Sequence, residues 1–348
     1  MLAAVLLLAA CQPQNEQESV AGPVFQEADS QIQAEVVAKN LDIPWSIDFF
    51  GDVIFLSERN GSIVMVDGDI TTRQDIQFEK ELSRAAEAGL LGFVLHPDFS
   101  SNRQAFAYYT YIEGGVDYNR VVSLEQLEGK WFERNIILDH IETGNVHHGG
   151  RLAISPDQKL FVTIGDAAVP ELAQDMDSLS GKILRFNLDG TIPEDNPFEG
   201  SPVYSTGHRN PQGLAWTEAG ELIATEHGAS AKDEINRIRA GANYGWPLIE
   251  GDEQREGLES PFVHSGASTW APSGAAVYNQ ELIFATLRGE SVKSVNLETG
   301  EIASLIEVYG RIRDVKVRNG ELYFATNNRD GRGNPSSVDD QLVRVRLP

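Results

Sequence analysis

Two adjacent histidines stand out in a chain that has only 7 histidines among 348 residues. They lie in the stretch VHHGGRL (146–152), and Asp166 follows at the end of the run KLFVTIGD. A histidine beside an aspartate is the usual arrangement of a general base, because the carboxylate fixes the imidazole tautomer and supports its charged form. We expect His147 and Asp166 on either side of a predicted strand pair, where they could make this contact. His148 competes for the same role.

Polar residues also follow several other predicted strands, and four of them are arginines. Taken singly, each arginine is most simply a surface or salt-bridge residue. Gathered at one end of an acidic protein, they would form a local positive site suited to a small ligand with several carboxylates. These four are Arg209, Arg288, Arg311 and Arg313.

The elements that must position these side chains are strands. Runs rich in β-branched and aromatic residues recur along the chain and are separated by Asn-Gly, Asp-Gly and similar turn pairs. Long amphipathic helical patterns are nearly absent. The sequence therefore predicts an all-β protein.

Several of the predicted strand pairs resemble one another, as in IFLSERNGSIVMV, LIATEHGASAKDEINRI, LIFATLRGESVKSV and LYFATNNRD. They recur at intervals of roughly 40 to 60 residues, the period of a four-stranded propeller blade with variable loops. The length of the body divided by that period predicts a six-bladed β-propeller, and an array of β-sandwiches is the alternative. In a propeller, loops from distant blades converge on one axis, so the polar residues after each strand would meet there.

Charge and cysteine content argue against several kinds of binding partner and site. With 52 acidic and 28 basic side chains the formal charge is −24, which opposes binding to nucleic acid or to an anionic membrane surface. The chain has a single cysteine, Cys11, so neither a disulfide nor a thiolate metal site is expected in the folded body.

The first residues, MLAAVLLLAACQPQ, form an apolar run too short to span a bilayer. The run is similar to a bacterial lipoprotein signal, and Leu8-Ala9-Ala10-Cys11 matches the lipobox pattern. We expect a signal over 1–11, a flexible tether over 12–31 and one folded domain over 32–348. The expected location is the periplasm, with a lipid anchor to the outer membrane at Cys11. An ordinary secretory signal or a buried thiol is the alternative.

Seven motifs follow one another along the chain: GLLGFVLHPDF (89–99), HHGGRLAISPDQKLFVTIGD (147–166), SGKILRFNLDGTIPEDNPF (180–198), GHRNPQGLAW (207–216), EHGASAKDEINRIRAGANYGWP (226–247), WAPSG (270–274) and RIRDV (311–315). Their order resembles the soluble pyrroloquinoline quinone (PQQ)-dependent aldose sugar dehydrogenases, also called the glucose/sorbosone dehydrogenase family. The resemblance covers the chain from residue 41 to the C-terminus, and the fold it implies is the six-bladed propeller.

The resemblance implies roles for individual residues. His147 falls at the catalytic base and Asp166 at the residue that orients it, whereas His148 has no implied role. Arg209 would polarise the quinone carbonyl together with Ca²⁺. The other implied cofactor contacts are Asn210, Gln212, Arg311 and Arg313.

Calcium is implied by the same resemblance. The backbone carbonyls of Gly228 and Ala229 match those that bind the ion holding PQQ, and Ca²⁺ prefers oxygen ligands. A second, structural calcium near Glu234 and Tyr244 is possible by the same analogy, with ordinary packing as the alternative.

Three positions depart from the family pattern. Arg288 stands where the family generally has a PQQ-binding lysine, which keeps the charge but not the geometry. Glu87 stands where relatives carry a glutamine near the quinone, and Ala229 stands where a proline is usual. A carboxylate at Glu87 would repel a trianionic cofactor unless it were protonated or turned away.

The expected function is therefore PQQ- and calcium-dependent oxidation of aldose sugars at C1 to the lactone, with an unidentified electron acceptor. Two other functions remain open. One is a calcium-dependent propeller hydrolase or lactonase, and the other is a non-catalytic propeller that binds carbohydrate or a partner.

Overall fold

The computed structural model describes residues 34–141 and 143–347. The predicted signal and tether therefore lie outside the described residues. Within the described residues the protein is all-β, as predicted. Its only helical elements there are α1 (Phe99–Asn102) and the 3-10 turn η1 (Pro170–Ala173). In this part of the chain no helix is long and apolar enough to cross a membrane.

The strands form five hydrogen-bonded sheets, and four of these have four strands each. One joins β1 (Ala34–Ala38), β24 (Leu342–Arg346), β23 (Glu321–Thr326) and β22 (Ile312–Arg318) in that order. The next runs through β10 (Leu152–Ile154), β11 (Lys159–Ile164), β12 (Lys182–Asn187) and β13 (Val203–Thr206). Another comprises β14 (Pro211–Trp216), β15 (Leu222–Glu226), β16 (Glu234–Ile238) and β17 (Val263–His264). The last comprises β18 (Pro272–Tyr278), β19 (Glu281–Thr286), β20 (Ser291–Asn296) and β21 (Ile302–Ile306).

The fifth sheet has eight strands and consists of two antiparallel units. The first unit is β2 (Pro44–Phe50), β3 (Val53–Glu58), β4 (Ser62–Asp67) and β5 (Ile70–Gln77). The second is β6 (Leu90–Leu95), β7 (Gln104–Glu113), β8 (Val116–Leu127) and β9 (Lys130–Ile141). A short parallel pairing of β5 with β9, at Ile76 and Gln77, joins the two units.

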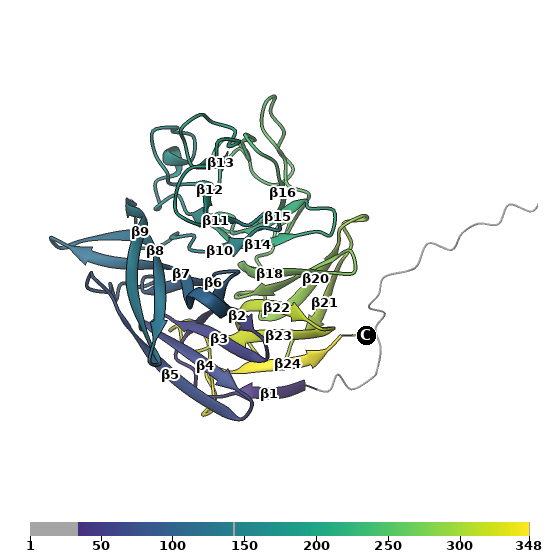
Figure 1. Ribbon diagram of the computed structural model, residues 1–348. Helices are drawn as coiled ribbons and strands as arrows, with labels where there is room; N and C mark the ends of the chain where they lie inside the picture. Colours follow the sequence, from purple (N-terminus) through teal and green to yellow (C-terminus); the bar gives the residue numbers. More distant parts are fainter. Residues whose placement is uncertain (1–33, 142, 348) are drawn as a thin grey trace, which may run out of the picture.

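The first strand of each unit lies at the centre of the molecule. Figure 1 shows β2, β6, β10, β14, β18 and β22 in the middle, with β5, β13 and β21 further out. Each central strand contacts the next, and β22 contacts β2, so the ring is closed. The first described strand, β1, pairs with β24 near the C-terminus, which brings the two ends of the described chain into one sheet. Loops from distant parts of the sequence therefore meet at the two ends of the ring.

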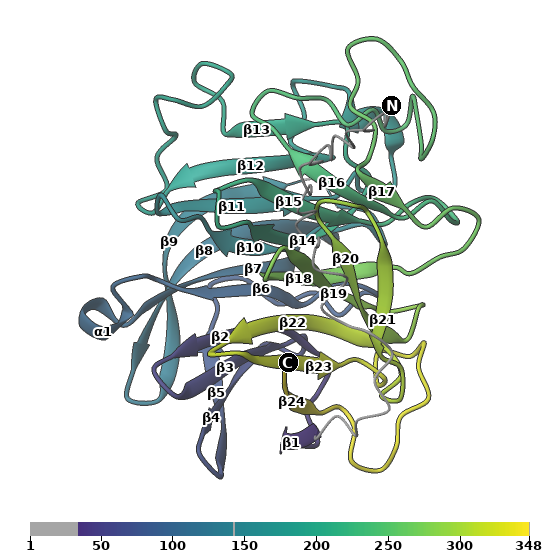
Figure 2. The same ribbon diagram turned by 90° about the vertical axis from the view of Figure 1, so that its right-hand side faces the viewer.

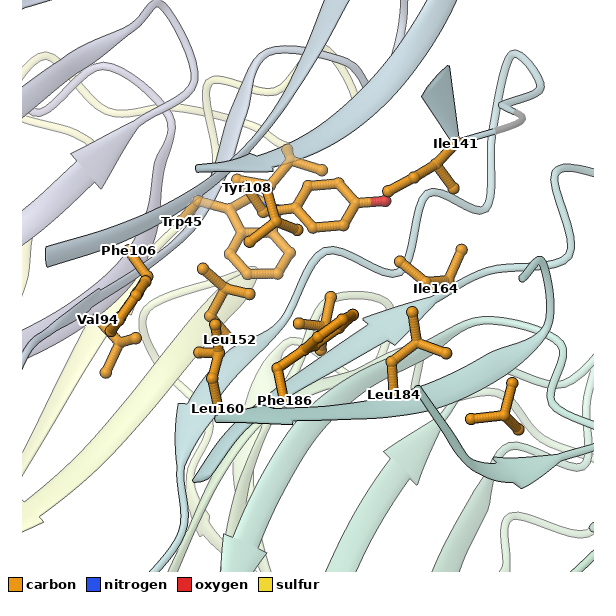
Figure 3. Close-up of a cluster of buried hydrophobic side chains, with 14 residues drawn as sticks. Trp45, Val94, Phe106, Tyr108, Ile141, Leu152, Leu160, Ile164, Leu184 and Phe186 are labelled. Atoms are coloured by element: carbon orange, nitrogen blue, oxygen red, sulfur yellow. The ribbon is translucent and has the colours of Figure 1, made fainter. Parts of the chain in front are cut away.

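Apolar layers between neighbouring units hold the ring together. One layer packs Trp45 and Tyr108 against Leu152, Leu184 and their neighbours (Figure 3). Because each sheet is covered on both faces, strands such as β6 and β19 are buried along their whole length. This explains why these strands read as continuous apolar runs instead of alternating patterns.

The two ends of the ring differ. Figure 2 shows α1 at the left side of the molecule and the loop between β23 and β24 at the right side. At the end near α1, a hollow is lined by Asp48, Phe50, Phe99 and Lys316. The opposite end carries the histidines and arginines singled out from the sequence.

Candidate active site

His147, Asp166 and Arg209 contact one another through their side chains. His147 precedes β10, Asp166 follows β11, and Arg209 precedes β14. The Nδ1 atom of His147 lies 2.7 Å from Oδ1 of Asp166, and its Nε2 lies 3.0 Å from Nη2 of Arg209. The contact expected between His147 and Asp166 is thus present, and Arg209 completes it from the next sheet.

The partners of His147 define its tautomer. A guanidinium only donates hydrogen bonds, so Nε2 must accept from Arg209 and carry no proton. The proton of the neutral ring therefore lies on Nδ1 and is donated to Asp166. Nε2 keeps its lone pair on the side away from Asp166, and His147 remains 18% exposed. This is the form that a general base requires.

Asp166 is itself held by three donors. Besides His147, it accepts at Oδ1 from the backbone N–H of Ala168 at 2.9 Å and at Oδ2 from Nε1 of Trp246 at 2.9 Å. The side chain of Asp166 is fully buried. Trp246 had no expected role; its only signal in the sequence is its place in the NYGWP stretch.

The Gly-Gly pair after the histidines is required by close packing. Gly149 has φ +66°, and a Cβ there would lie 2.5 Å from the carbonyl oxygen of Thr163. Its backbone N–H donates to Oδ1 of Asn210 at 3.0 Å. Asn210 thereby ties the loop of His147 to the loop of Arg209.

His148 does not share the position of His147. It is 3% exposed, and its Nδ1 lies 2.7 Å from Oγ1 of Thr143 and 3.2 Å from Oδ1 of Asn119. Its Nε2 is buried without a hydrogen-bond partner among the described residues. Burial lowers the pKa of His148 to about 4. The second histidine is thus a buried neutral group.

A stability prediction follows from His148. Its folded pKa is below the unfolded value of 6.5, so its contribution is fully present above pH 6.5 and is lost as the pH falls towards 4. The loss amounts to about 3 kcal/mol by linkage. Urea unfolding of the wild type and His148→Gln at pH 7 and pH 4 checks this: the variant should lose less stability on acidification. An equal loss in both proteins would contradict it.

A cavity at this end of the ring is lined mainly by charged and polar side chains. Its charged residues are Arg59, Glu87, Arg313, Asp330 and Arg332. Trp45, Gln212, His148 and His227 also line it. Arg59, Arg332 and Asp330 were not expected from the sequence. Arg59 and Asp330 lie in two of the repeated strand pairs, so their place after a strand was a signal that could have indicated them, whereas Arg332 lies in none of the quoted stretches.

Two of the expected arginines belong to this cavity or border it. Arg313 is buried, which lowers its pKa to about 9, and it donates to Oε1 of Gln212 at 2.7 Å and to Oδ1 of Asn327 at 3.2 Å. Arg311 donates to Oδ2 of Asp330 at 2.6 Å. Arg313 therefore has only neutral hydrogen-bond partners and can serve an anionic ligand.

Arg288 is placed differently. Its side chain is exposed and does not line the cavity. This side chain forms no hydrogen bond or ion pair with the described residues, and only the neighbouring Leu287 reaches the cavity wall. The structure therefore brings together three of the four expected arginines.

Glu87 faces the cavity and is ionised. Burial alone would raise its pKa, but the hydrogen bond and charge of Arg332 and the N–H of His147 lower it to about 2. Oε1 lies 2.7 Å from Nη1 of Arg332, and Oε2 accepts from the His147 backbone N–H at 3.2 Å. Glu87 is thus neither protonated nor turned away from the cavity, and Arg332 pairs with it in place.

Three of the four residues expected at calcium sites, Gly228, Glu234 and Tyr244, form hydrogen bonds within the protein. The N–H of Gly228 donates to Oδ1 of Asp233 at 2.9 Å, and Ala229 is exposed. The pKa of Glu234 is raised to about 8 by burial and by the charge of Glu226. The hydroxyl of Tyr244 bonds to the backbone at Arg237 and Arg239.

The described residues include no group of three or more acidic, histidine or cysteine side chains that could hold a metal ion. Calcium takes six to eight oxygen ligands. Two backbone carbonyls supply at most two of these, so the described side chains do not form a calcium shell without further ligands.

Comparisons with known proteins agree on one family. The sequence model of the glucose/sorbosone dehydrogenase family matches residues 41–343. Aldose sugar dehydrogenase YliI of Escherichia coli is 30% identical over 87% of this chain and 92% of its own length. Quinoprotein glucose dehydrogenase B of Acinetobacter calcoaceticus is 35% identical over 67% of this chain, and the match spans 56% of that relative.

Solved structures give the same result. The PQQ-bound aldose sugar dehydrogenase of Streptomyces coelicolor superposes with a TM-score of 0.84 at 34% identity. The match covers 90% of this chain and 98% of that structure.

Proposed function

From the premise that the chain belongs to the glucose/sorbosone dehydrogenase family, we propose that it is a PQQ-dependent aldose sugar dehydrogenase. The observation that carries this proposal is the contact of His147 with both Asp166 and Arg209 beside a cavity rich in arginine. An unprotonated base nitrogen and a cationic pocket are the two parts that such a reaction needs. The six four-stranded units around the closed ring support a six-bladed propeller as its scaffold.

The charges that line the cavity suit a ligand with several carboxylates. Arg59, Arg313 and Arg332 line it against two carboxylates, Glu87 and Asp330. Buried polar atoms without partners among the described residues include Nε2 of His148 and of His227, which both line the cavity. Unpartnered buried polar atoms are costly, and a bound polar ligand would satisfy them. We propose that Arg313 and Gln212 hold the cofactor with Arg311 and Asn210 beside them, and that Arg288 approaches it only if its loop moves.

In the proposed mechanism, Nε2 of His147 takes the proton of the anomeric hydroxyl of the sugar. Asp166 keeps the imidazole oriented and stabilises the positive charge that this proton brings. Arg209 lies beside Nε2 and would stabilise negative charge developing on the reacting oxygens. When bound, PQQ supplies the acceptor for the hydride that leaves C1. The sugar product is the lactone.

The binding of Ca²⁺ is also a proposal, and no step of the mechanism above depends on it. The carbonyls of Gly228 and Ala229 would supply two ligands, and the cofactor and water would have to supply the others. The second site near Glu234 and Tyr244 also remains a prediction.

Location and partners are proposals as well. A periplasmic protein held at the outer membrane by lipid on Cys11 would meet aldoses there and pass electrons to an acceptor that is not identified.

Reconstitution tests the proposed function. Addition of PQQ with CaCl₂ to the purified apoprotein should produce dye reduction with aldoses, and calorimetry should detect PQQ binding. Omitting CaCl₂ or replacing it by MgCl₂ shows whether calcium is needed. Absence of binding at micromolar PQQ would contradict the proposal.

The same measurements separate the alternatives. Binding of PQQ without turnover would favour a non-catalytic propeller. A calcium-dependent hydrolase needs carboxylate or amide side chains around its metal, whereas in this cavity three arginines face two carboxylates, and each carboxylate is already paired with an arginine.

A further inference from the structure

Glu87 links the loop of the proposed base to a second loop of the cavity. One of its carboxylate oxygens accepts from the backbone N–H of His147 at 3.2 Å, and the other pairs with Arg332 at 2.7 Å. Arg332 lies in the loop between β23 and β24, whereas Glu87 precedes β6. The pair therefore crosses from one unit of the ring to another.

Both ends of this link are anchored. Arg59 donates from Nε to the carbonyl oxygen of Ala88 at 3.0 Å and from Nη2 to that of Ala86 at 2.8 Å, on either side of Glu87. On the other loop, Oδ1 of Asp330 accepts from the backbone N–H of Arg332 at 2.9 Å. The carboxylate of Asp330 is in turn paired with Arg311. Contacts thus connect Arg311, Asp330, Arg332 and Glu87, with a backbone N–H as the link between Asp330 and Arg332.

The backbone of His147 needs support from such a link. Its φ is +65°, a left-handed conformation that costs a residue other than glycine about 1 kcal/mol or more. A carboxylate that accepts from its N–H favours this conformation and so helps to aim the imidazole. An unpaired carboxylate at that point would repel any anionic ligand in the cavity.

We propose that Glu87 and Arg332 act as a matched pair, in which Glu87 positions the His147 loop and Arg332 neutralises Glu87 so that a polyanionic cofactor can bind. This inference rests on the proposed function. It makes Glu87 a positioning residue and gives Arg332 a role in cofactor affinity through Glu87. It also explains how the chain accommodates a carboxylate at this point of the cavity.

A double-mutant cycle tests the neutralising role. PQQ in CaCl₂ buffer is titrated by calorimetry into the wild type, Glu87→Gln, Arg332→Gln and the double variant. Arg332→Gln should weaken binding roughly tenfold or more, because a half-buried carboxylate in the cavity wall is left uncompensated. The same change made on top of Glu87→Gln should weaken binding at least about threefold less. Arg255→Gln removes the same charge from an exposed loop and should leave the affinity unchanged.

The results of this cycle distinguish a failure of the inference from a failure of the proposed function. If Arg332→Gln has the same effect with and without Glu87→Gln, Arg332 does not act through Glu87 and the inference is overturned. If the wild type binds no PQQ, the proposed function fails together with the inference. Thermal unfolding of each variant without PQQ shows whether a loss of affinity reflects a loss of folding.

Hydrogen exchange tests the positioning role without the cofactor. Glu87→Ala removes the acceptor of the His147 N–H, so a peptide spanning this amide should exchange several-fold faster. Glu87→Gln keeps an acceptor oxygen and should exchange as the wild type does. Equal exchange in Glu87→Ala and the wild type would overturn this part of the inference.

Discussion

Replacing His147 by glutamine is expected to lower kcat for aldose oxidation by roughly 10²- to 10⁴-fold, the usual contribution of a general base. Glutamine fills a similar volume but cannot take up a proton at the position of Nε2. Binding of PQQ should change little, because the arginines of the cavity remain. Steady-state kinetics of the reconstituted enzyme, together with calorimetric titration of PQQ, measures the two effects separately.

The neighbouring histidine provides a matched control. His148→Gln alters a buried ring that faces Thr143 and Asn119 and does not contact Asp166. Because His148 also lines the cavity, this variant should reduce stability and the affinity for PQQ more than kcat. If His148→Gln abolished turnover while His147→Gln retained it, the assignment of the base would be wrong.

The second large effect is expected for Asp166→Asn, with a loss in kcat of roughly 10²- to 10⁴-fold. The carboxylate accepts from Nδ1 of His147 at one oxygen and from Nε1 of Trp246 at the other. An asparagine has only one acceptor oxygen, so its NH₂ group must face one of these two donors. Either orientation disturbs the tautomer or the orientation of His147.

Two further variants show whether the loss of kcat in Asp166→Asn comes from the contacts of Asp166 itself. Asp175→Asn makes the same change at an exposed position of the same loop and should leave kcat unchanged. Trp246→Phe removes only one of the donors to Asp166 and should cost no more than roughly ten- to 150-fold, which corresponds to about 1.5 to 3 kcal/mol for one hydrogen bond to a charged group. A loss for Trp246→Phe as large as that for Asp166→Asn would show that the indole has a role beyond orienting Asp166.

Much of the fold could be predicted from the sequence because its signals are local. Apolar runs bounded by turn pairs predict buried strands, and the repeated strand pairs predict similar units. Both signals depend only on neighbouring residues. What they do not encode is the joining of two units into one eight-stranded sheet, since the β5–β9 pairing involves only two residue pairs.

Part of the candidate site could also be predicted from the sequence. His147 and Asp166 flank the β10–β11 hairpin, so their contact follows from local chain geometry. The contacts that complete the site join residues far apart in the chain. Trp246 is 80 residues from Asp166, and Arg313 is 101 residues from Gln212. No local pattern indicates such pairs.

The sequence by itself predicted the all-β class and membership of the family, and it singled out His147 and Asp166, which we propose as the base and its orienting residue. Only the tertiary structure decided which charges meet: it brought Arg332 to Glu87 and left Arg288 exposed. The physical reason is that the type of a side chain, and whether its segment forms a strand, depend only on residues nearby in the sequence. The electrostatic environment of that side chain depends on loops that the closed ring of strands brings together from the whole chain.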